Sequence, residues 1–373
     1  MLQHLLSEMI ETKRIYWLDN LRTFLIFLVV LFHVAVIYEK FSMGALWWIL
    51  IDPSNSDLPG ILFLILNIFV IATLFFIGGY FAPLSLKSKT WKQFIVIKFK
   101  RIIIPWIIAV LTLIPFYKII FLYSRGLPQE HWFSYFHWTN GIWGMNWLWF
   151  LPILFIFEML YLLFSKIDTS KINLRNSIII VFIISFLFSF MMDFFGFHGW
   201  TYTFLFDFQN ERIFIYFMMF LLGSQCYKLN ILNSEKRNKR LDIILDSIGW
   251  IPIGAYVFML IYSLITPNYL ISKVFHIFIT RISFVLSLAY LLYVSVNSFR
   301  KYFNKTGKII DELNKNSYYV YIIHVIILGL IALLMLNTGI HSLLKMLISI
   351  VVTYIISNLM VSGFRKTFSG VKL

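Results

Sequence analysis

Charged residues are scarce in this sequence. Asp, Glu, Lys and Arg make up 13% of its 373 residues, whereas about 25% is usual in a soluble domain. Hydrophobic residues make up 60%, and they gather in runs that are too long and too numerous to be the buried helices of a soluble protein. The composition therefore excludes a water-soluble globule and predicts an integral membrane protein surrounded by a lipid bilayer.

Cysteine and acidic residues are also scarce. The single cysteine, Cys226, excludes a disulfide within the chain and a cysteine-rich metal site, and we expect no metal. Only 17 Asp and Glu stand against 32 Lys and Arg, which gives a net charge of +15. In a soluble protein this excess would indicate a polyanion such as nucleic acid as a partner. In a membrane protein, positive charges first report which side of the membrane each loop faces.

Ten apolar runs are long enough to cross about 30 Å of hydrocarbon as helices. The first follows Lys13 and Arg14 and has no small-residue cleavage site after it, so we expect it to remain as a span rather than to be removed as a signal peptide. Two runs are short, so nine or eleven spans are alternatives. The runs are 16–38, 61–82, 102–122, 147–164, 177–192, 213–227, 243–265, 274–296, 317–336 and 343–360.

The sequence thus predicts an all-α integral membrane protein with about ten transmembrane helices. We expect one domain over residues 1–373, with a cytoplasmic N-terminal segment at 1–15 and a cytoplasmic tail at 361–373. Placing the N-terminus inside puts 25 of the 32 Lys and Arg residues on the cytoplasmic side and leaves others, such as Arg212 and Lys345, outside. Both termini are then cytoplasmic. Most of the net charge reports orientation, and we expect no nucleic-acid partner.

The first run carries a cation and an imidazole on one helix face. Arg22 and His33 are eleven residues apart, so they are about three turns apart, with His33 roughly 16 Å deeper in the membrane. Ionisable groups inside spans are costly and indicate function. The structural alternative is that Arg22 reaches lipid headgroups and His33 hydrogen-bonds a neighbouring helix. Arg22 could also order this helix through Asp19.

Three cations, Lys98, Lys100 and Arg101, stand at the cytoplasmic mouth of the third run. Lys98 and Arg101 share a helix face, which suits the binding of a phosphate or pyrophosphate. The alternative is an anchor that follows the positive-inside rule. Pro105 leaves the carbonyl of Arg101 without its helical donor, so we expect a kink here.

Five further polar residues lie inside the predicted spans. Glu158 and Arg281 would be mutual counter-charges if their helices touch, a role as much structural as catalytic. His324 follows Ser317 and Tyr321 at helical spacing, which gives a face of hydroxyls and imidazole; a histidine hydrogen-bonded between helices is the alternative. The five residues are Asn67, Glu158, Arg281, His324 and Asn358.

Two loops on the predicted outer side are rich in aromatic residues. Residues 129–150 are crowded with Trp, and residues 193–212 add Trp200, Tyr202 and Asp207. Aromatic faces beside carboxylates and amides suit sugar rings, which have apolar faces and many hydroxyls. The interfacial aromatic belt of membrane proteins predicts the same residue types, so the sequence leaves both interpretations open.

Five elements in order resemble the family-3 membrane acyltransferases, and together they extend over residues 16–330. Within that family, the Tyr80-Phe81 turn and the lack of a fused extracytoplasmic domain look most like the glucan-modifying branch that includes succinyltransferases. The elements are Leu18-Asp19-x-Leu21-Arg22 with His33, Phe75-Phe76-Ile77-Gly78-Gly79-Tyr80-Phe81, Lys98-x-x-Arg101 with Pro105, Trp149-Phe150-Leu151, and Ser317-Tyr318-x-x-Tyr321-x-x-His324.

Two positions depart from the family pattern. Gly78 stands where the family usually has Ser, so no nucleophilic hydroxyl is expected there. Lys98 stands where the family usually has Arg, which keeps the charge but loses the bidentate fork.

The resemblance implies an O-acyltransferase of the bacterial cytoplasmic membrane. It would move an acetyl or succinyl group from cytoplasmic acyl-CoA to a hydroxyl of an extracytoplasmic carbohydrate. His33 is then expected to be the general base, with a covalent acyl-histidine as the alternative. The other candidate catalytic residues are Arg22, Asp19, Glu158 and His324, and the candidates for binding the donor are Lys98, Arg101, Ser317 and Tyr321.

A transporter of a small anionic or glycan solute is the rival interpretation. Buried Arg, Glu and His would suit proton coupling. Many transporters, however, contain inverted repeats with interrupted helices in matching positions, and the two halves of this sequence show no such pairing.

Overall fold

The structure, a computed structural model, describes residues 14–41, 43, 47–87, 89–136, 145–169, 171–203, 206–231 and 239–367. The predicted N-terminal segment lies outside these residues except for its last two. Residues 137–144 of the aromatic loop and 368–373 of the predicted tail also lie outside them.

Helices make up most of the described chain, which confirms the all-α membrane fold. Nine of them are long and apolar enough to cross a membrane, and they coincide with nine of the predicted runs. The elements in chain order are α2 (Tyr16–Tyr38), α3 (Asp57–Leu86), α4 (Trp91–Lys98), the π-helical turn η1 (Phe99–Ile103), α5 (Ile104–Ser124), the 3-10 turns η2 (Trp132–Phe136) and η3 (Asn146–Trp149), α6 (Phe150–Phe164), α7 (Leu174–Phe194), β1 (Trp200–Tyr202), β2 (Asp207–Gln209), α8 (Asn210–Lys228), α9 (Lys239–Ile248), α10 (Trp250–Ile265), α11 (Lys273–Tyr302), α12 (Lys308–Met335) and α13 (Ser342–Thr367).

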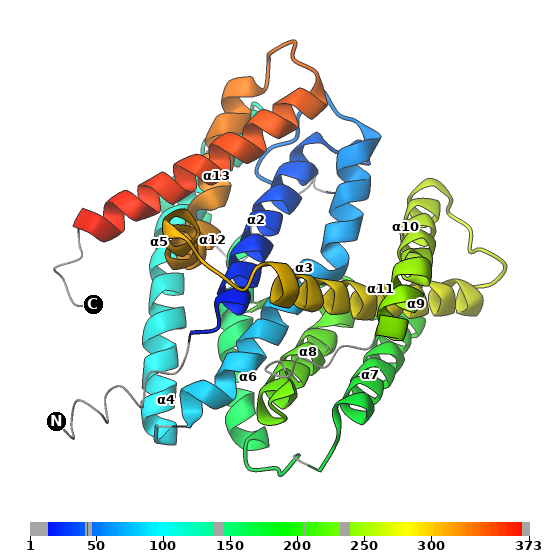
Figure 1. The fold of residues 1–373 in the computed structure, drawn as a ribbon. Helices are drawn as coiled ribbons and strands as arrows, with labels where there is room; N and C mark the ends of the chain where they lie inside the picture. Colours follow the sequence, from blue (N-terminus) through cyan, green and yellow to red (C-terminus); the bar gives the residue numbers. More distant parts are fainter. Residues whose placement is uncertain are drawn as a thin grey trace, which may run out of the picture.

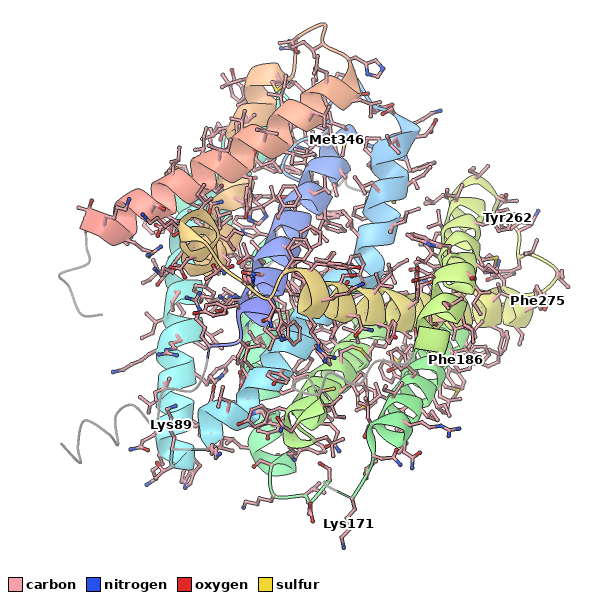
Figure 2. The ribbon with its side chains drawn as sticks, in the orientation of Figure 1. Lys89, Lys171, Phe186, Tyr262, Phe275 and Met346 are labelled. Atoms are coloured by element: carbon pink, nitrogen blue, oxygen red, sulfur yellow. The ribbon has the colours of Figure 1, made fainter. Side chains whose placement is uncertain are left out.

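Helix α2 lies near the centre of the molecule, and α3, α12 and α13 pack against it (Figure 1). Helix α8 runs along α3, while α7, α10 and α11 form the side away from α13 (Figure 1). Lys89 and Lys171 come from two loops that were both predicted to be cytoplasmic. They lie toward the same end of the molecule, opposite Met346 (Figure 2).

The tenth predicted run, 213–227, also forms a helix, α8, although its polar ends make it less apolar than the other nine. At each end of α8, a hydrogen bond joins it or its flanking strand to a segment next to the end of α6. Gln225 donates to the carbonyl oxygen of Thr169, just after α6, at 2.8 Å. At the other end, the amide of Met145, just before α6, donates to the carboxylate of Asp207 at 2.6 Å. Helix α8 therefore extends between the same two ends of the molecule as α6.

Helix α7 buries small, mostly polar residues and exposes bulky apolar ones, as a helix that faces lipid does. Its buried positions recur every fourth residue and are small: Ser177, Val181, Ser185 and Ser189. Its exposed positions hold bulky apolar side chains such as Ile183, which is 54% exposed. Small residues at helix contacts allow close approach in membranes, where apolar surface faces lipid tails at no cost.

Helices α3 and α8 cross with backbone against backbone. A Cβ added to Gly79 would lie 1.8 Å from the carbonyl oxygen of Phe220, and one added to Gly223 would lie 2.0 Å from that of Phe76. Neither position therefore tolerates a side chain. A Cβ at the neighbouring Gly78 would meet only the end of a leucine side chain, at 2.9 Å. The Gly-Gly pair thus includes one strictly structural glycine, Gly79.

The kink predicted at Pro105 takes the form of a π-helical turn. Because Pro105 has no N–H, the carbonyl of Arg101 has no helical donor, and the helix widens so that Ile104 N–H donates to the carbonyl of Phe99, five residues back. The free carbonyl of Arg101 accepts from the Tyr318 hydroxyl of α12 at 2.9 Å instead. Helix α12 therefore fixes the turn that carries Arg101.

A fully buried ion pair ties the loop after α2 to α13. Lys345 Nζ lies 2.8 Å and 3.1 Å from the two carboxylate oxygens of Asp52, and the two side chains are 1% and 0% exposed. The sequence placed Lys345 on the outer side of the membrane, and the structure shows that its side chain is buried in this pair. Because one charge without the other would be buried uncompensated, the pair holds this loop in place.

Candidate active site

Two of the predicted site residues meet in the interior, His33 of α2 and His324 of α12. His33 Nδ1 lies 2.8 Å from His324 Nε2. The two rings stack with centroids 5.0 Å apart, and the residues are 8% and 0% exposed. The sequence indicated each residue separately, and the packing of α12 against α2 brings them together.

His324 is also bonded within its own helix. Its Nδ1 lies 2.8 Å from the carbonyl oxygen of Tyr321 and 3.1 Å from that of Val320. A carbonyl can only accept a hydrogen bond, so Nδ1 is the donor in both contacts.

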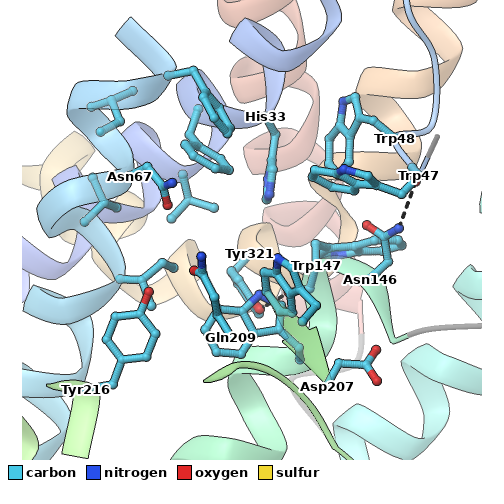
Figure 3. A pocket seen from close by; sticks show the side chains of 18 of the residues that line it. His33, Trp47, Trp48, Asn67, Asn146, Trp147, Asp207, Gln209, Tyr216 and Tyr321 are labelled. Carbon is cyan, nitrogen blue, oxygen red and sulfur yellow. Dashed lines mark hydrogen bonds between the residues drawn. The ribbon is translucent and has the colours of Figure 1, made fainter. Parts of the chain in front are cut away.

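A cavity of about 180 Å³ lies beside His33. Figure 3 shows the imidazole projecting into it, across from Gln209 and Asn146. Helices α2 and α3, the loop after α2, η3 and the β1–β2 hairpin all contribute to its walls. The lining is mostly aromatic with a few polar groups: Val29, Phe32, His33, Trp47, Trp48, Phe63, Leu66, Asn67, Val70, Ile71, Asn146, Trp147, Trp149, Trp200, Tyr202, Asp207, Gln209, Tyr216 and Tyr321.

Trp48 forms the second stacking face of His33, with ring centroids 4.7 Å apart. Its backbone is held by α5, because Arg125 donates to the Trp48 carbonyl at 2.9 Å and the Tyr117 hydroxyl donates to the Trp47 carbonyl. Trp48 was not among the predicted site residues. The sequence feature that indicates it is the Trp47-Trp48 pair in the short link between the first two spans.

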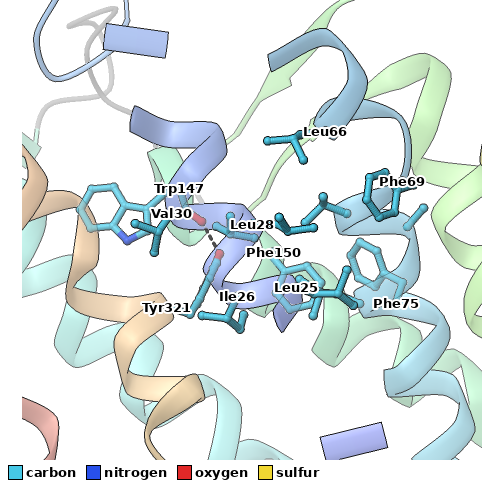
Figure 4. Close-up of a cluster of buried hydrophobic side chains, with 14 of the residues drawn as sticks. Leu25, Ile26, Leu28, Val30, Leu66, Phe69, Phe75, Trp147, Phe150 and Tyr321 are labelled. Carbon is cyan, nitrogen blue, oxygen red and sulfur yellow. Dashed lines mark hydrogen bonds between the residues drawn. The ribbon is translucent and has the colours of Figure 1, made fainter. Parts of the chain in front are cut away.

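The aromatic loops turn inward at the cavity. Trp147 is 2% exposed, and its indole N–H donates to the carbonyl of Ile322 at 2.9 Å. The Tyr321 hydroxyl donates to the carbonyl of Trp147, and both side chains border the apolar cluster between α2 and α3 (Figure 4). These contacts join η3 to α12.

Asp207 joins the hairpin to η3. Its carboxylate accepts from the amide of Met145 at 2.6 Å, and the residue is 2% exposed. Burial raises the pKa of Asp207 to about 6, because the charged form is poorly solvated there. Burial thus favours the neutral form of this carboxyl group in the cavity wall.

Arg212 supports another wall of the cavity. Its guanidinium donates to the backbone carbonyl and the side-chain oxygen of Asn67 at 2.7 Å and 3.0 Å, and to the Tyr256 hydroxyl at 2.9 Å. The sequence placed Arg212 on the outer side of the membrane, and its side chain is buried, with 3% exposed. The predicted interior residue Asn67 faces the cavity with Arg212 behind it.

A family model for an acyltransferase domain matches residues 15–361 of the chain. The chain belongs to acyltransferase family 3. The match includes all five elements that carried the resemblance. Comparison with curated proteins and with solved structures found no match. This acyltransferase is thus a multi-pass membrane protein, with nine candidate spans in the part of the chain that the structure describes.

Arg22 and Asp19 of the acyltransferase lie at the other end of α2, about three turns from His33. Arg22 donates to the carbonyl of Asn314 at 3.2 Å and lies 3.4 Å from the carboxylate of Asp19. Asp19 also accepts from Arg14 at 2.7 Å. These contacts order the start of α2 against α12, and neither predicted residue lies in the cavity wall.

Glu158 of the acyltransferase pairs with Lys98 rather than with Arg281. The Lys98 ammonium lies 2.5 Å from the Glu158 carboxylate, and their side chains are 13% and 3% exposed. Arg281 instead binds Asp193 through two hydrogen bonds of 2.5 Å and 2.7 Å. The predicted Glu158–Arg281 contact is therefore wrong, because α11 packs against α7, whereas α6 packs against α4 and η1.

The remaining predicted donor-binding residues are spread along the molecule. Arg101 has an exposed side chain at the π-helical turn. Ser317 is buried and donates to the carbonyl of Asn314 at 3.1 Å, and Tyr321 lines the cavity. Among the described residues, no three His, Cys, Asp or Glu side chains gather as a metal site requires.

Proposed function

We propose that this protein acylates a carbohydrate hydroxyl on the outer face of a bacterial cytoplasmic membrane, with acyl-CoA as the donor and acetyl or succinyl as the transferred group. The observation that carries the proposal is the imidazole of His33 projecting into a cavity lined by aromatic and amide side chains. Membership of the acyltransferase family gives the reaction class.

The cavity wall supports a sugar ring as the acceptor. Trp147, Trp149, Trp200 and Tyr202 come from the two aromatic loops and line the cavity, whereas a belt residue would face lipid. Trp132 of the first loop does not line the cavity, and it fits the belt instead. The volume of about 180 Å³ is below the range of about 300–1,000 Å³ of sites that enclose a whole drug-sized ligand. It therefore suits one ring of a larger glycan.

His33 acts as the general base in this proposal. The acceptor oxygen attacks the thioester carbon while His33 takes the hydroxyl proton. The new C–O bond forms as the C–S bond breaks, and the departing CoA sulfur takes the proton from His33. An acyl-histidine intermediate would instead show ping-pong kinetics, which initial-rate measurements with both substrates varied would reveal.

Arg101 is the proposed first contact of the CoA phosphates. Its side chain is exposed at the predicted cytoplasmic mouth, whereas Lys98 is bound to Glu158. Ser317 and Tyr321 would contact the donor farther in, and Arg22 and Asp19 would order the start of α2. Arg101→Ala should raise the KM for acyl-CoA more than Lys98→Ala does. A larger rise in the KM for the acceptor would remove Arg101 from the donor site.

Three of the interior cations are paired with carboxylates, which weighs against their use for ion coupling by the rival transporter. Lys98, Arg281 and Lys345 each have a carboxylate partner within 2.8 Å. These charges are therefore neutralised by fixed neighbours rather than left to bind a coupling ion. Transport of a glycan or anion by reconstituted protein without consumption of acyl-CoA would support the transporter instead.

The direct test is His33→Ala. With folding confirmed by size-exclusion chromatography, transfer of a labelled acetyl or succinyl group from CoA to surface glycan should fall about 10²-fold or more. The matched control is His341→Ala, which removes an exposed histidine at the start of α13 and should leave transfer unchanged. Full transfer by the His33 variant would reject the assignment.

A further inference from the structure

The contact between His33 and His324 has only one favourable arrangement of protons. His324 Nδ1 faces the carbonyl oxygens of Tyr321 and Val320 at 2.8 Å and 3.1 Å, so it carries the hydrogen. In a neutral imidazole the other nitrogen is then an acceptor. His324 Nε2 therefore accepts, and His33 Nδ1, at 2.8 Å, donates to it.

The reverse arrangement would be unfavourable. If His324 donated from Nε2, its Nδ1 lone pair would face two carbonyl oxygens, which cannot donate. The cost would be that of leaving buried polar groups unpaired, since His324 is 0% exposed.

We propose that His324 is a positioning residue that holds His33 in the tautomer with hydrogen on Nδ1 and a free lone pair on Nε2. This inference rests on the proposed base role of His33. Nε2 is then the atom that takes the acceptor's proton. During that step His33 becomes an imidazolium whose Nδ1–H remains bonded to His324, so no proton moves between the two rings.

The other neighbours of His33 do not replace His324 in this role. Trp48 stacks on the ring and Phe32 makes a T-shaped contact with it, so neither offers an acceptor, and the Tyr321 hydroxyl is committed to the carbonyl of Trp147. Removing the His324 acceptor would leave the His33 ring free to exchange tautomers and to turn within its slot.

Two amide substitutions separate positioning from packing. The side chain of His324→Asn keeps a donor for the carbonyls of its own helix but is too short to reach His33. The side chain of His324→Gln is long enough to place its Oε1 where Nε2 was and to accept from His33 Nδ1–H. Both variants are polar and of similar size, so their effects on folding are comparable.

The experiment measures kcat and the KM of both substrates. His324→Asn should lower kcat about 10²-fold with little change in either KM, and His324→Gln should recover most of the loss. Adding His324→Asn to His33→Ala should cause no further loss, because His324 acts only through His33. If Asn and Gln behave alike, if Asn keeps near-normal kcat, or if the double variant is additive, the positioning role is wrong.

The two proposals can fail separately. Full activity of His33→Ala overturns the proposed base whatever His324 does. Inactivity of His33→Ala together with normal activity of His324→Asn overturns only the positioning role. Should His324→Asn not fold, His324→Gln still decides the matter, since a folded Gln variant with kcat reduced as far as in His33→Ala contradicts the proposal.

Discussion

The cavity and the α10–α11 hairpin each contain a buried histidine that donates a hydrogen bond across a helix pair, but the two histidines donate through different ring nitrogens. His276 Nδ1 accepts from the amide of Leu270 at 3.3 Å, so its hydrogen is on Nε2, 2.9 Å from the Ser263 hydroxyl. His276 is therefore a donor that ties two helices together and cannot activate Ser263. In His33, Nδ1 is the donor, and in our proposal Nε2 remains for a substrate. The difference teaches that the hydrogen-bond partners, rather than burial, distinguish the proposed base from a histidine that only ties two helices together.

The largest expected effect tests this contrast directly. His33→Ala should lower transfer about 10²–10⁴-fold. His276→Ala should leave transfer nearly unchanged, although each variant loses a hydrogen bond worth about 1 kcal/mol of stability. Transfer rates and thermal unfolding in detergent measure both. Loss of transfer in a folded His276 variant would contradict the different roles assigned to the two histidines.

The next largest effect is expected for two ion pairs, Lys345–Asp52 and Arg281–Asp193, whose loss should lower stability by different amounts. Lys345→Met leaves Asp52 buried without its partner and should destabilise the protein by about 3–5 kcal/mol. Arg281→Met breaks the pair with Asp193, whose side chains are 10% and 13% exposed, and should cost about 1–3 kcal/mol. Thermal unfolding of both variants gives the comparison. The double variant Asp52→Asn/Lys345→Met should recover stability if the unpaired charge is the cause.

Asp207 gives the wall of the cavity a pH dependence. Its folded-state pKa of about 6 is above the ordinary value of about 4, so its contribution to stability is present below pH 4 and is lost as the pH rises through 6. Asp207→Asn should remove this change, worth about 1–3 kcal/mol, while its amide oxygen still accepts from Met145. Unfolding measured from pH 4 to pH 7 checks this, and parallel curves for wild type and variant would contradict it.

Tyr318→Phe should have the smallest effect. It removes the hydroxyl that satisfies the Arg101 carbonyl and should cost about 1 kcal/mol, with a raised KM for acyl-CoA. The matched control is Tyr319→Phe, at the adjacent position, which is 44% exposed. An equal effect of both substitutions on the KM would show that the bond to Arg101 does not matter.

Much of the fold and part of the site could be predicted from the sequence. Apolar runs are a property of each segment, so the spans and the family elements with His33 and His324 were accessible. The partners of the buried side chains could not be predicted, because hydropathy does not encode which helices touch. Glu158 could therefore be placed in a span but not matched to Lys98, and Arg212 could not be assigned to the wall behind Asn67. Trp48 was missed because its role comes only from the ring it stacks on.

Helix α12 touches both ends of the proposed reaction path. Tyr318 bonds the turn that carries Arg101, and His324, six residues and about 9 Å farther along, bonds His33. A movement of that turn when the donor binds would therefore be passed along a single rigid helix to the base. If the donor and the acceptor bind as proposed, we expect them to alter each other's affinity. In Tyr318→Phe, CoA should lose its effect on acceptor binding, and an unchanged effect would show that α12 does not transmit it.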